Sequence, residues 1–196
     1  MKILVIDNSR FNHESARATL KGHDLTIISS FDEAMDIMRK KVDADNVQRL
    51  LIDAGFAEKP DYSDREWSAY WQALRESETK SVIPFEFEVV LTDMMMPVSM
   101  KTIGPGVYRP GEEVPYGFVI ALKAASLGAK FVAMVTDGNH HEDAMIAAIE
   151  CLNPSYFANG EISSFTINGA KAVFVQAPLC GDRRKDWGKV LADLIS

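Results

Sequence analysis

Short apolar runs alternate with stretches of helical periodicity along this chain. Residues 2–7 (KILVID), 87–93 (FEVVLTD) and 130–137 (KFVAMVTD) are rich in aliphatic and β-branched side chains, and each run ends at an aspartate. Runs of this kind are typical of strands buried on both faces of a parallel sheet. Residues 24–30 and 172–178 have the same character. The pattern therefore predicts five parallel strands.

Segments with helical signals lie between these runs. Ser9 is placed to cap a helix that extends to about Lys21, and Ser30 with Glu33 forms a capping box ahead of a second helix. Later segments with helical spacing lie at about 116–128, 141–152 and 184–195. Parallel neighbours need crossover connections, and these keep one hand. The alternation therefore predicts an α/β fold, a doubly wound five-stranded parallel sheet with helices on both faces.

Three stretches interrupt the alternation and predict insertions within a single domain, at about 42–86, 98–115 and 153–170. The first insertion contains a helix of its own, with Trp67, Tyr70 and Trp71 on one face. Within it, the run 50–56 (LLIDAGF) fits either an extra strand or a helix end, and Asp53 is a weak candidate for chemistry. The second insertion is rich in Gly and Pro, and the third fits a loop or a small hairpin.

Composition narrows the class of protein. The chain has 196 residues and a formal net charge of -7, which argues against a broad surface for nucleic acid or anionic membrane. The two cysteines, Cys151 and Cys180, have no paired metal-ligand spacing. The N-terminal apolar run is far shorter than a signal peptide, and no run approaches the length of a membrane span. We therefore expect a cytoplasmic protein without a nucleic-acid or membrane partner.

Acidic and hydroxyl side chains mark the carboxyl ends of three predicted strands. Asp7 ends the first strand, Asp93 the third, and Thr136 with Asp137 the fourth. Open α/β sheets bind ligands at this edge, where the strand order reverses. In a flavodoxin-like order the first and third strands are neighbours, so Asp7 would face Asp93. Because two nearby carboxylates repel each other, a hard cation such as Mg²⁺ is expected between them.

The same segments resemble the receiver domain of two-component response regulators. The resemblance covers most of the chain outside the insertions and lies in ILVIDNS, SSFDEAMDIM, VVLTDMMMP with its D-x-x-M-P pattern, VAMVTDG and VFVQAP. It implies that Asp93 is the phosphoacceptor, and that Asp7 and Asp93 bind Mg²⁺ together with the backbone carbonyl of Met95. It also implies that Thr136 holds the phosphoryl group and that Phe174 is the aromatic residue that reports the state of the site.

Two positions depart from the family pattern. Asn8 stands where the family has a second acid, and it would hold a metal-bound water without adding charge. Ala177 stands where the family has its active-site lysine. A replacement cation is expected from the insertions or the fifth strand, with candidates Lys101, Arg109 and Lys171. Pro178 matches a family proline that follows a cis peptide, so Ala177–Pro178 is a candidate cis bond.

Plainer interpretations stand beside these. Asp7 is suited to cap the following helix, and Met94 to Met96 are typical of core packing. The acids and histidines of 137–143 (DGNHHED) are typical of a solvated helix N-terminus, since adjacent helical side chains point in different directions.

Three functions remain open at this point. The first is a phosphoacceptor receiver, which takes a phosphoryl group from a histidine kinase or a small phosphodonor and signals through a protein partner or a homodimer. The second is a pseudo-receiver, which keeps the fold for protein interaction without phosphorylation. The third is a small Mg²⁺-dependent phosphate-transferring enzyme, although the chain has no Walker-type loop and no G-x-G-x-x-G motif.

Overall fold

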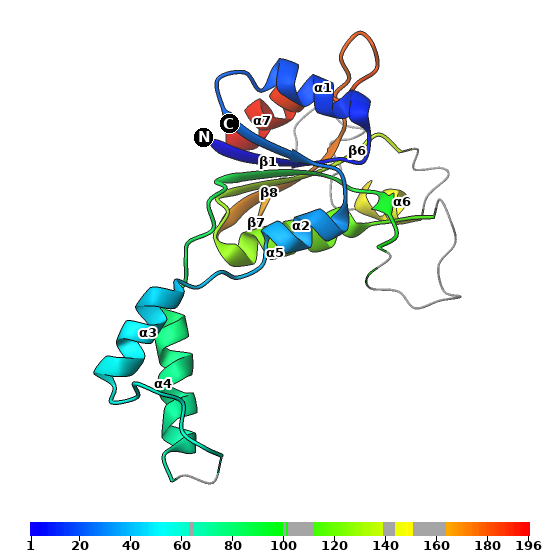
Figure 1. Ribbon diagram of the computed structural model, residues 1–196. Helices are drawn as coiled ribbons and strands as arrows, with labels where there is room; N and C mark the ends of the chain where they lie inside the picture. The colour runs from blue at the N-terminus through cyan, green and yellow to red at the C-terminus, as the bar shows by residue number, and fades with distance from the viewer. Residues whose placement is uncertain (63–64, 100, 102–111, 139–143, 151–163) are drawn as a thin grey trace. The chain divides into compact units, whose positions relative to one another are not determined.

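The computed structural model describes residues 1–62, 65–99, 101, 112–138, 144–150 and 164–196 (Figure 1). These residues form two compact units. The sheet unit comprises Met1–Met38 and Phe85–Ser196, and the hairpin unit comprises Arg39–Pro84. The hairpin unit corresponds to the first predicted insertion.

The sheet unit is built on a mostly parallel sheet of six strands in the order β2-β1-β3-β6-β8-β7. The strands are β1 (Lys2–Ile6), β2 (Asp24–Ile28), β3 (Val89–Asp93), β6 (Phe131–Thr136), β7 (Ser164–Ile167) and β8 (Ala170–Gln176). The first five in the order pair in parallel, and they coincide with the five predicted strands. β1 and β3 are neighbours, as expected.

The sixth strand is a difference from the five-stranded prediction. β7 pairs antiparallel with β8 at the edge of the sheet and lies in the segment predicted as a loop or a small hairpin. Its turn contains Asn168 and Gly169, which have φ angles of 47° and 85°. Two consecutive positive φ values suit the tight turns that match strand twist, and Asn-Gly is the preferred pair there.

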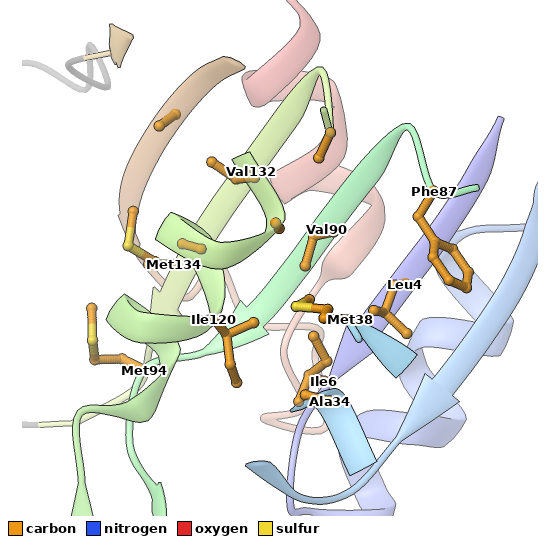
Figure 2. Close-up of a cluster of buried hydrophobic side chains, with 14 of the residues drawn as sticks. Leu4, Ile6, Ala34, Met38, Phe87, Val90, Met94, Ile120, Val132 and Met134 are labelled. Carbon is orange, nitrogen blue, oxygen red and sulfur yellow. The ribbon is translucent and has the colours of Figure 1, made fainter. Parts of the chain in front are cut away.

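Helices cover both faces of the sheet (Figure 1). α1 (Arg10–Thr19) and α7 (Trp187–Ile195) pack on one face, and α2 (Phe31–Ile37) and α5 (Tyr116–Leu127) pack on the other. α6 (Ala144–Glu150) follows β6. Side chains alternate along β1, so Leu4 and Ile6 join the core under α2 and α5 shown in Figure 2. The intervening Ile3 and Val5 join the core under α1 and α7.

Two helix starts bear on the site. The predicted capping box of α2 is present, because Ser30 Oγ accepts a hydrogen bond from Glu33 N at 3.2 Å. α7 was predicted from about residue 184, but it begins at Trp187. Asp186 caps it by accepting from Lys189 N at 3.0 Å. Lys185 therefore lies before the helix and not in its first turn.

The hairpin unit consists of two helices, α3 (Ala44–Asp53) and α4 (Trp67–Lys80). The ambiguous run 50–56 forms the end of α3, and Asp53 is exposed there. The chain enters and leaves this unit side by side, because Val42 and Val82 form an antiparallel bridge. Asp43 caps α3 by accepting from Asn46 N at 3.1 Å.

The second predicted insertion begins and ends in a short ribbon. β4 (Met96–Pro97) and β5 (Glu113–Val114) pair antiparallel, and Val98 N donates to Glu112 O at 3.1 Å. Residues 102–111 of this insertion lie outside the described part of the chain. Among the described helices, none is both long and apolar enough to cross a membrane.

Candidate functional site

The sheet brings Asp7 and Asp93 to the same edge. Ile6 of β1 is in register with Thr92 of β3, so the residues that follow them emerge together at the carboxyl ends of neighbouring strands. Thr136 ends β6, which is the next strand in the order. Asp7 and Asp93 are both buried, with residue exposures of 0% and 7%. The predicted pairing of these two aspartates is therefore present.

A lysine that sequence reasoning missed lies between the aspartates. Lys185 Nζ is 2.9 Å from Asp93 Oδ1 and 3.0 Å from Asp7 Oδ2, and the Lys185 side chain is 1% exposed. The more exposed Asp137 contributes a longer contact, with its Oδ1 at 3.5 Å from the same nitrogen. One buried ammonium group thus faces three carboxylates, and its charge offsets their mutual repulsion.

A tight turn after β8 returns Lys185 to this edge. Leu179 and Lys185 form an antiparallel bridge, and Asp186 N donates to Pro178 O at 2.6 Å. Between them, Cys180 N donates to Arg184 O at 2.8 Å. The chain therefore leaves the sheet after Ala177, turns, and brings Lys185 back alongside Leu179.

Helix α1 fixes the backbone of Lys185. Lys185 N donates to Asn12 Oδ1 at 3.1 Å, and Lys185 O accepts from Ser15 Oγ at 2.6 Å. The neighbouring Trp187 Nε1 donates to Asn12 O at 3.2 Å, and its ring lies 5.9 Å from Lys185 Nζ. Because the backbone on both sides is held, the ammonium group is positioned before any ligand arrives.

Asp7 is held by hydrogen bonds from the start of α1. Its Oδ1 accepts from Ser9 N at 2.7 Å and from Asn12 Nδ2 at 3.2 Å. Its Oδ2 accepts from Asn12 Nδ2 at 3.0 Å as well as from Lys185. The Ser9 side chain makes no capping bond to α1. Asp7 instead accepts from the backbone amide of Ser9, the N-cap residue, and from the side chain of Asn12. Asp7 consequently has little capacity left for a further ligand.

Asp93 has a different electrostatic environment. Burial is the main cause that raises the pKa of its carboxyl group, the Lys185 ammonium opposes the increase, and the charge of Asp7 adds to it. The resulting pKa is about 7. Burial alone would lower the pKa of Lys185, but the carboxylates of Asp93 and Asp7 outweigh it, so the pKa is raised and Lys185 stays charged. The site thus holds a permanent cation beside a carboxyl group that titrates near neutrality.

Three further predicted site residues, Thr136, Asn8 and Met95, have other partners than Lys185. Thr136 is buried at the end of β6, and its Oγ1 accepts from Gly138 N at 3.1 Å. Asn8 Nδ2 donates to Glu113 Oε1 at 3.0 Å, so this amide meets the ribbon formed by β4 and β5. Met95 is partly buried and packs against the core under α5. Within the described part of the chain, neither Asn8 nor Thr136 pairs with Lys185.

Phe174, the predicted reporter, lies in the core. It is 2% exposed and stacks on Phe118 and Phe165, with ring centroids 5.8 Å and 5.4 Å away. Phe165 belongs to β7, so the extra strand covers the side of Phe174 that faces the sheet edge. Its reporting role stays a prediction.

Two of the three cations expected to replace the family lysine, Lys101 and Lys171, lie elsewhere. Lys101 Nζ pairs with Asp36 Oδ2 of α2 at 3.2 Å. Lys171 lies near the start of β8, at the opposite end of the strand from Asp93. Arg109 lies outside the described residues. The described chain also has no cis peptide bond, so the expectation for Ala177–Pro178 is wrong.

The sequence contains only a weak signal for the position of Lys185. The stretch LCGDRRK, residues 179–185, contains a Gly-Asp pair of the kind that marks turns. A helix over about 184–195 would place this lysine in its first turn, where a charged side chain normally faces solvent. The pairing of Leu179 with Lys185 and the hydrogen bonds within the turn show that the chain reverses direction here. Asn12 left no signal, because its function depends on contacts with Asp7 and Lys185.

Whether these residues could bind a divalent cation depends on which carboxylate oxygens do not already accept a hydrogen bond. No group of three or more His, Cys, Asp or Glu side chains forms a ready metal site among the described residues. Mg²⁺ in proteins, however, is commonly bound by one or two carboxylates and keeps several waters. Asp93 uses Oδ1 for Lys185, and no described residue donates to Oδ2. The donor set at this edge therefore fits Mg²⁺ in kind, through Asp93 more than Asp7.

The chain matches no family model, no curated protein and no solved structure.

Proposed function

We propose that this chain is an atypical receiver-like signalling domain of the doubly wound, flavodoxin-like type, with Asp93 as the phosphoacceptor. The observation that carries the proposal is the 2.9 Å contact between Lys185 Nζ and Asp93 Oδ1. A buried cation held against one oxygen of a nearly buried carboxylate is suited to receive a second anionic group at that carboxylate. The lysine that the sequence lacks at Ala177 is supplied from a later position.

The chemistry follows from these contacts. The Asp93 carboxylate attacks the phosphorus of a phosphodonor, and the new O–P bond forms an acyl phosphate. The leaving atom, an oxygen in acetyl phosphate or an imidazole nitrogen in a phosphorylated histidine kinase, departs with the electron pair of its broken bond to phosphorus. Lys185 donates to the oxygens that carry the added charge. Asp7 and Asn12 keep Lys185 in place, and the Thr136 hydroxyl is the group available to bind the phosphoryl oxygen from β6.

Mg²⁺ belongs to the same proposal. When bound, it would offset the negative charge that accumulates as the phosphoryl group approaches. Asp93, the backbone carbonyl of Met95 and Asn8 would hold it. Asp7 would act mainly through Lys185, because its oxygens already accept from Ser9 and Asn12.

The output would pass through protein contacts. Phosphorylation adds charge at the ends of β3 and β6, and Phe174 lies in the neighbouring strand β8 within the core. A shift of Thr136 toward the phosphoryl group would change the packing around Phe174. The donor would be a histidine kinase or a small phosphodonor, and the target a protein partner or a second copy of the chain in the cytoplasm.

One observation favours a second candidate function. The same ion cluster joins the ends of β1, β3 and the turn after β8, and Asn12 ties it to α1. Such a network stabilises the edge of the sheet without any phosphate. In that case the chain is a pseudo-receiver, an interaction module in which Asp93 is structural.

Intact-mass analysis separates the two candidates. The parent protein and the Asp93→Asn variant are incubated with acetyl phosphate and MgCl₂, and both are checked for native circular dichroism. The receiver function predicts a single phosphoryl adduct in the parent and none in the variant. A folded parent protein without an adduct would favour the pseudo-receiver.

A further inference from the structure

Glu113, at the far end of the second insertion, accepts a hydrogen bond from Asn8 in the loop after β1. We propose that Glu113 supplies the acidic oxygen that Asn8 does not provide, and that it is a ligand, directly or through water, for a divalent cation bound at Asp93. The inference rests on the proposed function. It reverses the expectation from the sequence, in which this insertion would contribute a cation to the site.

The contact that places Glu113 joins two loops of the candidate site. Asn8 follows β1, and its Nδ2 lies 3.0 Å from Glu113 Oε1. Glu113 is in register with Pro97 in the ribbon, and Pro97 belongs to the segment that follows Asp93. Glu113 thus links the loop after β1 to the loop after β3, the two loops that carry the carboxylates of the site.

The ribbon that presents Glu113 is firmly attached to the core. Met96, one residue before Pro97, is fully buried, and its partner in the ribbon is Val114. Immediately after the ribbon, Gly117 N donates to Met94 O at 3.0 Å. The carboxylate is therefore carried by backbone that is fixed to β3 on both sides, although the side chain itself is exposed.

The hydrogen bond also sets the orientation of Asn8. A carboxylate can only accept, so the amide nitrogen of Asn8 must face Glu113 and its carbonyl oxygen must face away. That carbonyl oxygen and the second oxygen of Glu113 are hard donors without a partner among the described residues. Hard oxygen donors of this kind are the ligands that Mg²⁺ and Mn²⁺ prefer.

A second observation points to a ligand at this edge. The Asp93 side chain is 9% exposed, and no described residue donates to its Oδ2. The oxygens of Asp7 already accept hydrogen bonds from other groups. A cation bound only by Asp93 Oδ2 and the neutral carbonyl oxygen of Asn8 would have little negative charge around it. Glu113 provides the missing charge, and it does so from an element inserted between the loop after β3 and helix α5.

The test is a calorimetric titration of the phosphate-free protein with MgCl₂. We compare the parent with Glu113→Gln, with Glu112→Gln as a matched control on the adjacent exposed residue, and with Asn8→Asp in the Glu113→Gln background. The proposal predicts that Glu113→Gln weakens Mg²⁺ binding by about tenfold or more. Glu112→Gln should bind as the parent does, and Asn8→Asp should recover much of the loss.

Equal Mg²⁺ affinity in the parent and in Glu113→Gln would overturn the proposal, as would a parent that binds no Mg²⁺ at millimolar concentration. Acetyl phosphate labelling of the same samples tests the proposed function separately. A Glu113-dependent Mg²⁺ site without an adduct at Asp93 would uphold the ligand role and reject the receiver function. An adduct at Asp93 that forms equally with and without Glu113 and Mg²⁺ would uphold the receiver function and reject the ligand role of Glu113.

Discussion

Lys185 Nζ lies 2.9 Å from Asp93 Oδ1, although the two residues come from distant parts of the sheet unit's sequence. Asp93 ends a central strand, and Lys185 precedes the last helix. The ammonium group also contacts Asp7, so it is the element that lets two aspartates share a buried edge. The stability of the site and its proposed chemistry therefore depend on the same nitrogen.

Replacing this lysine should strongly destabilise the protein. Lys185→Met leaves the carboxylates of Asp7 and Asp93 buried without their cation, and removal of one partner from a buried ion pair costs about 3–5 kcal/mol. Urea unfolding at pH 8 measures the change in free energy of unfolding. Lys189→Met is the control, because its ammonium is exposed and its pair with Asp193 contributes about 1 kcal/mol at most. A loss below about 1 kcal/mol for Lys185→Met would show that the cluster is not structurally important.

The raised pKa of Asp93 makes stability depend on pH in a defined direction. The carboxyl group titrates near 3.8 in the unfolded chain and near 7 in the folded one, mainly because of burial. Between these values the folded state holds more protons, so its stability falls as the pH rises from about 4 to about 7 and then levels off. Asp93→Asn lacks this contribution. The difference in unfolding free energy, parent minus variant, should therefore decrease across this window, and an increase would contradict the assignment.

The same pKa predicts the pH dependence of labelling. Under the proposed function the ionised Asp93 carboxylate is the nucleophile, so the initial rate of adduct formation with acetyl phosphate should rise through about pH 7 and reach a plateau above it. Quenched intact-mass time courses from pH 6 to pH 8.5 would measure it. A rate that is flat over this range would mean that Asp93 is already fully ionised at pH 6, which requires a pKa well below 7.

Gly117 lies where α5 closely approaches the end of β3. A Cβ atom at this position would lie 2.2 Å from Asp93 O and 2.7 Å from Met94 Cα, which are backbone atoms with little room to move. Gly117→Ala should therefore lower the free energy of unfolding by about 2 kcal/mol or more, although alanine favours helices. In Gly181→Ala the added methyl group meets no atom within 4 Å, so this variant should be near neutral. Similar denaturation midpoints for the two variants would argue against this packing.

The hairpin unit should be removable. Neither core cluster of the sheet unit contains a residue of 39–84. Ile83 N donates to Lys41 O at 3.0 Å, so the two ends of the excised segment already lie together. Replacing residues 42–82 with a short Gly-Ser linker should give a protein that unfolds cooperatively and labels at Asp93 as the parent does. Loss of cooperative thermal unfolding would show that the sheet unit depends on the hairpin unit.

Much of the sheet could be predicted because its signals are local. The runs around Val5, Val90 and Val135 have the composition of doubly buried strands, and the crossovers imply that neighbouring strands are parallel. A flavodoxin-like strand order then places Asp7 and Asp93 at the ends of neighbouring strands. The edge strand β7 was harder to predict. A short strand with one neighbour buries few side chains, so its sequence lacks the apolar run of a central strand.

Lys185 could not be predicted, for a physical reason. A lysine is almost always exposed unless it is paired, and its partners here come from other strands. Its burial depends on the turn at 178–186, the contacts from Asn12 and the carboxylates of Asp7 and Asp93. The run 50–56 was ambiguous for a related reason: a short apolar stretch fits a strand or a helix until its packing partner is known.

Under the proposed function, Asp93 accepts a phosphoryl group beside Lys185. Borohydride reduction after acetyl phosphate treatment identifies the modified residue, because it converts an aspartyl phosphate to homoserine at that position. Peptide mass mapping should then find homoserine at position 93 of the parent, at no other aspartate, and in much lower yield in Lys185→Arg, which keeps the charge but not the compact ammonium. Homoserine at another aspartate, or none in a folded parent that binds Mg²⁺, would contradict the account.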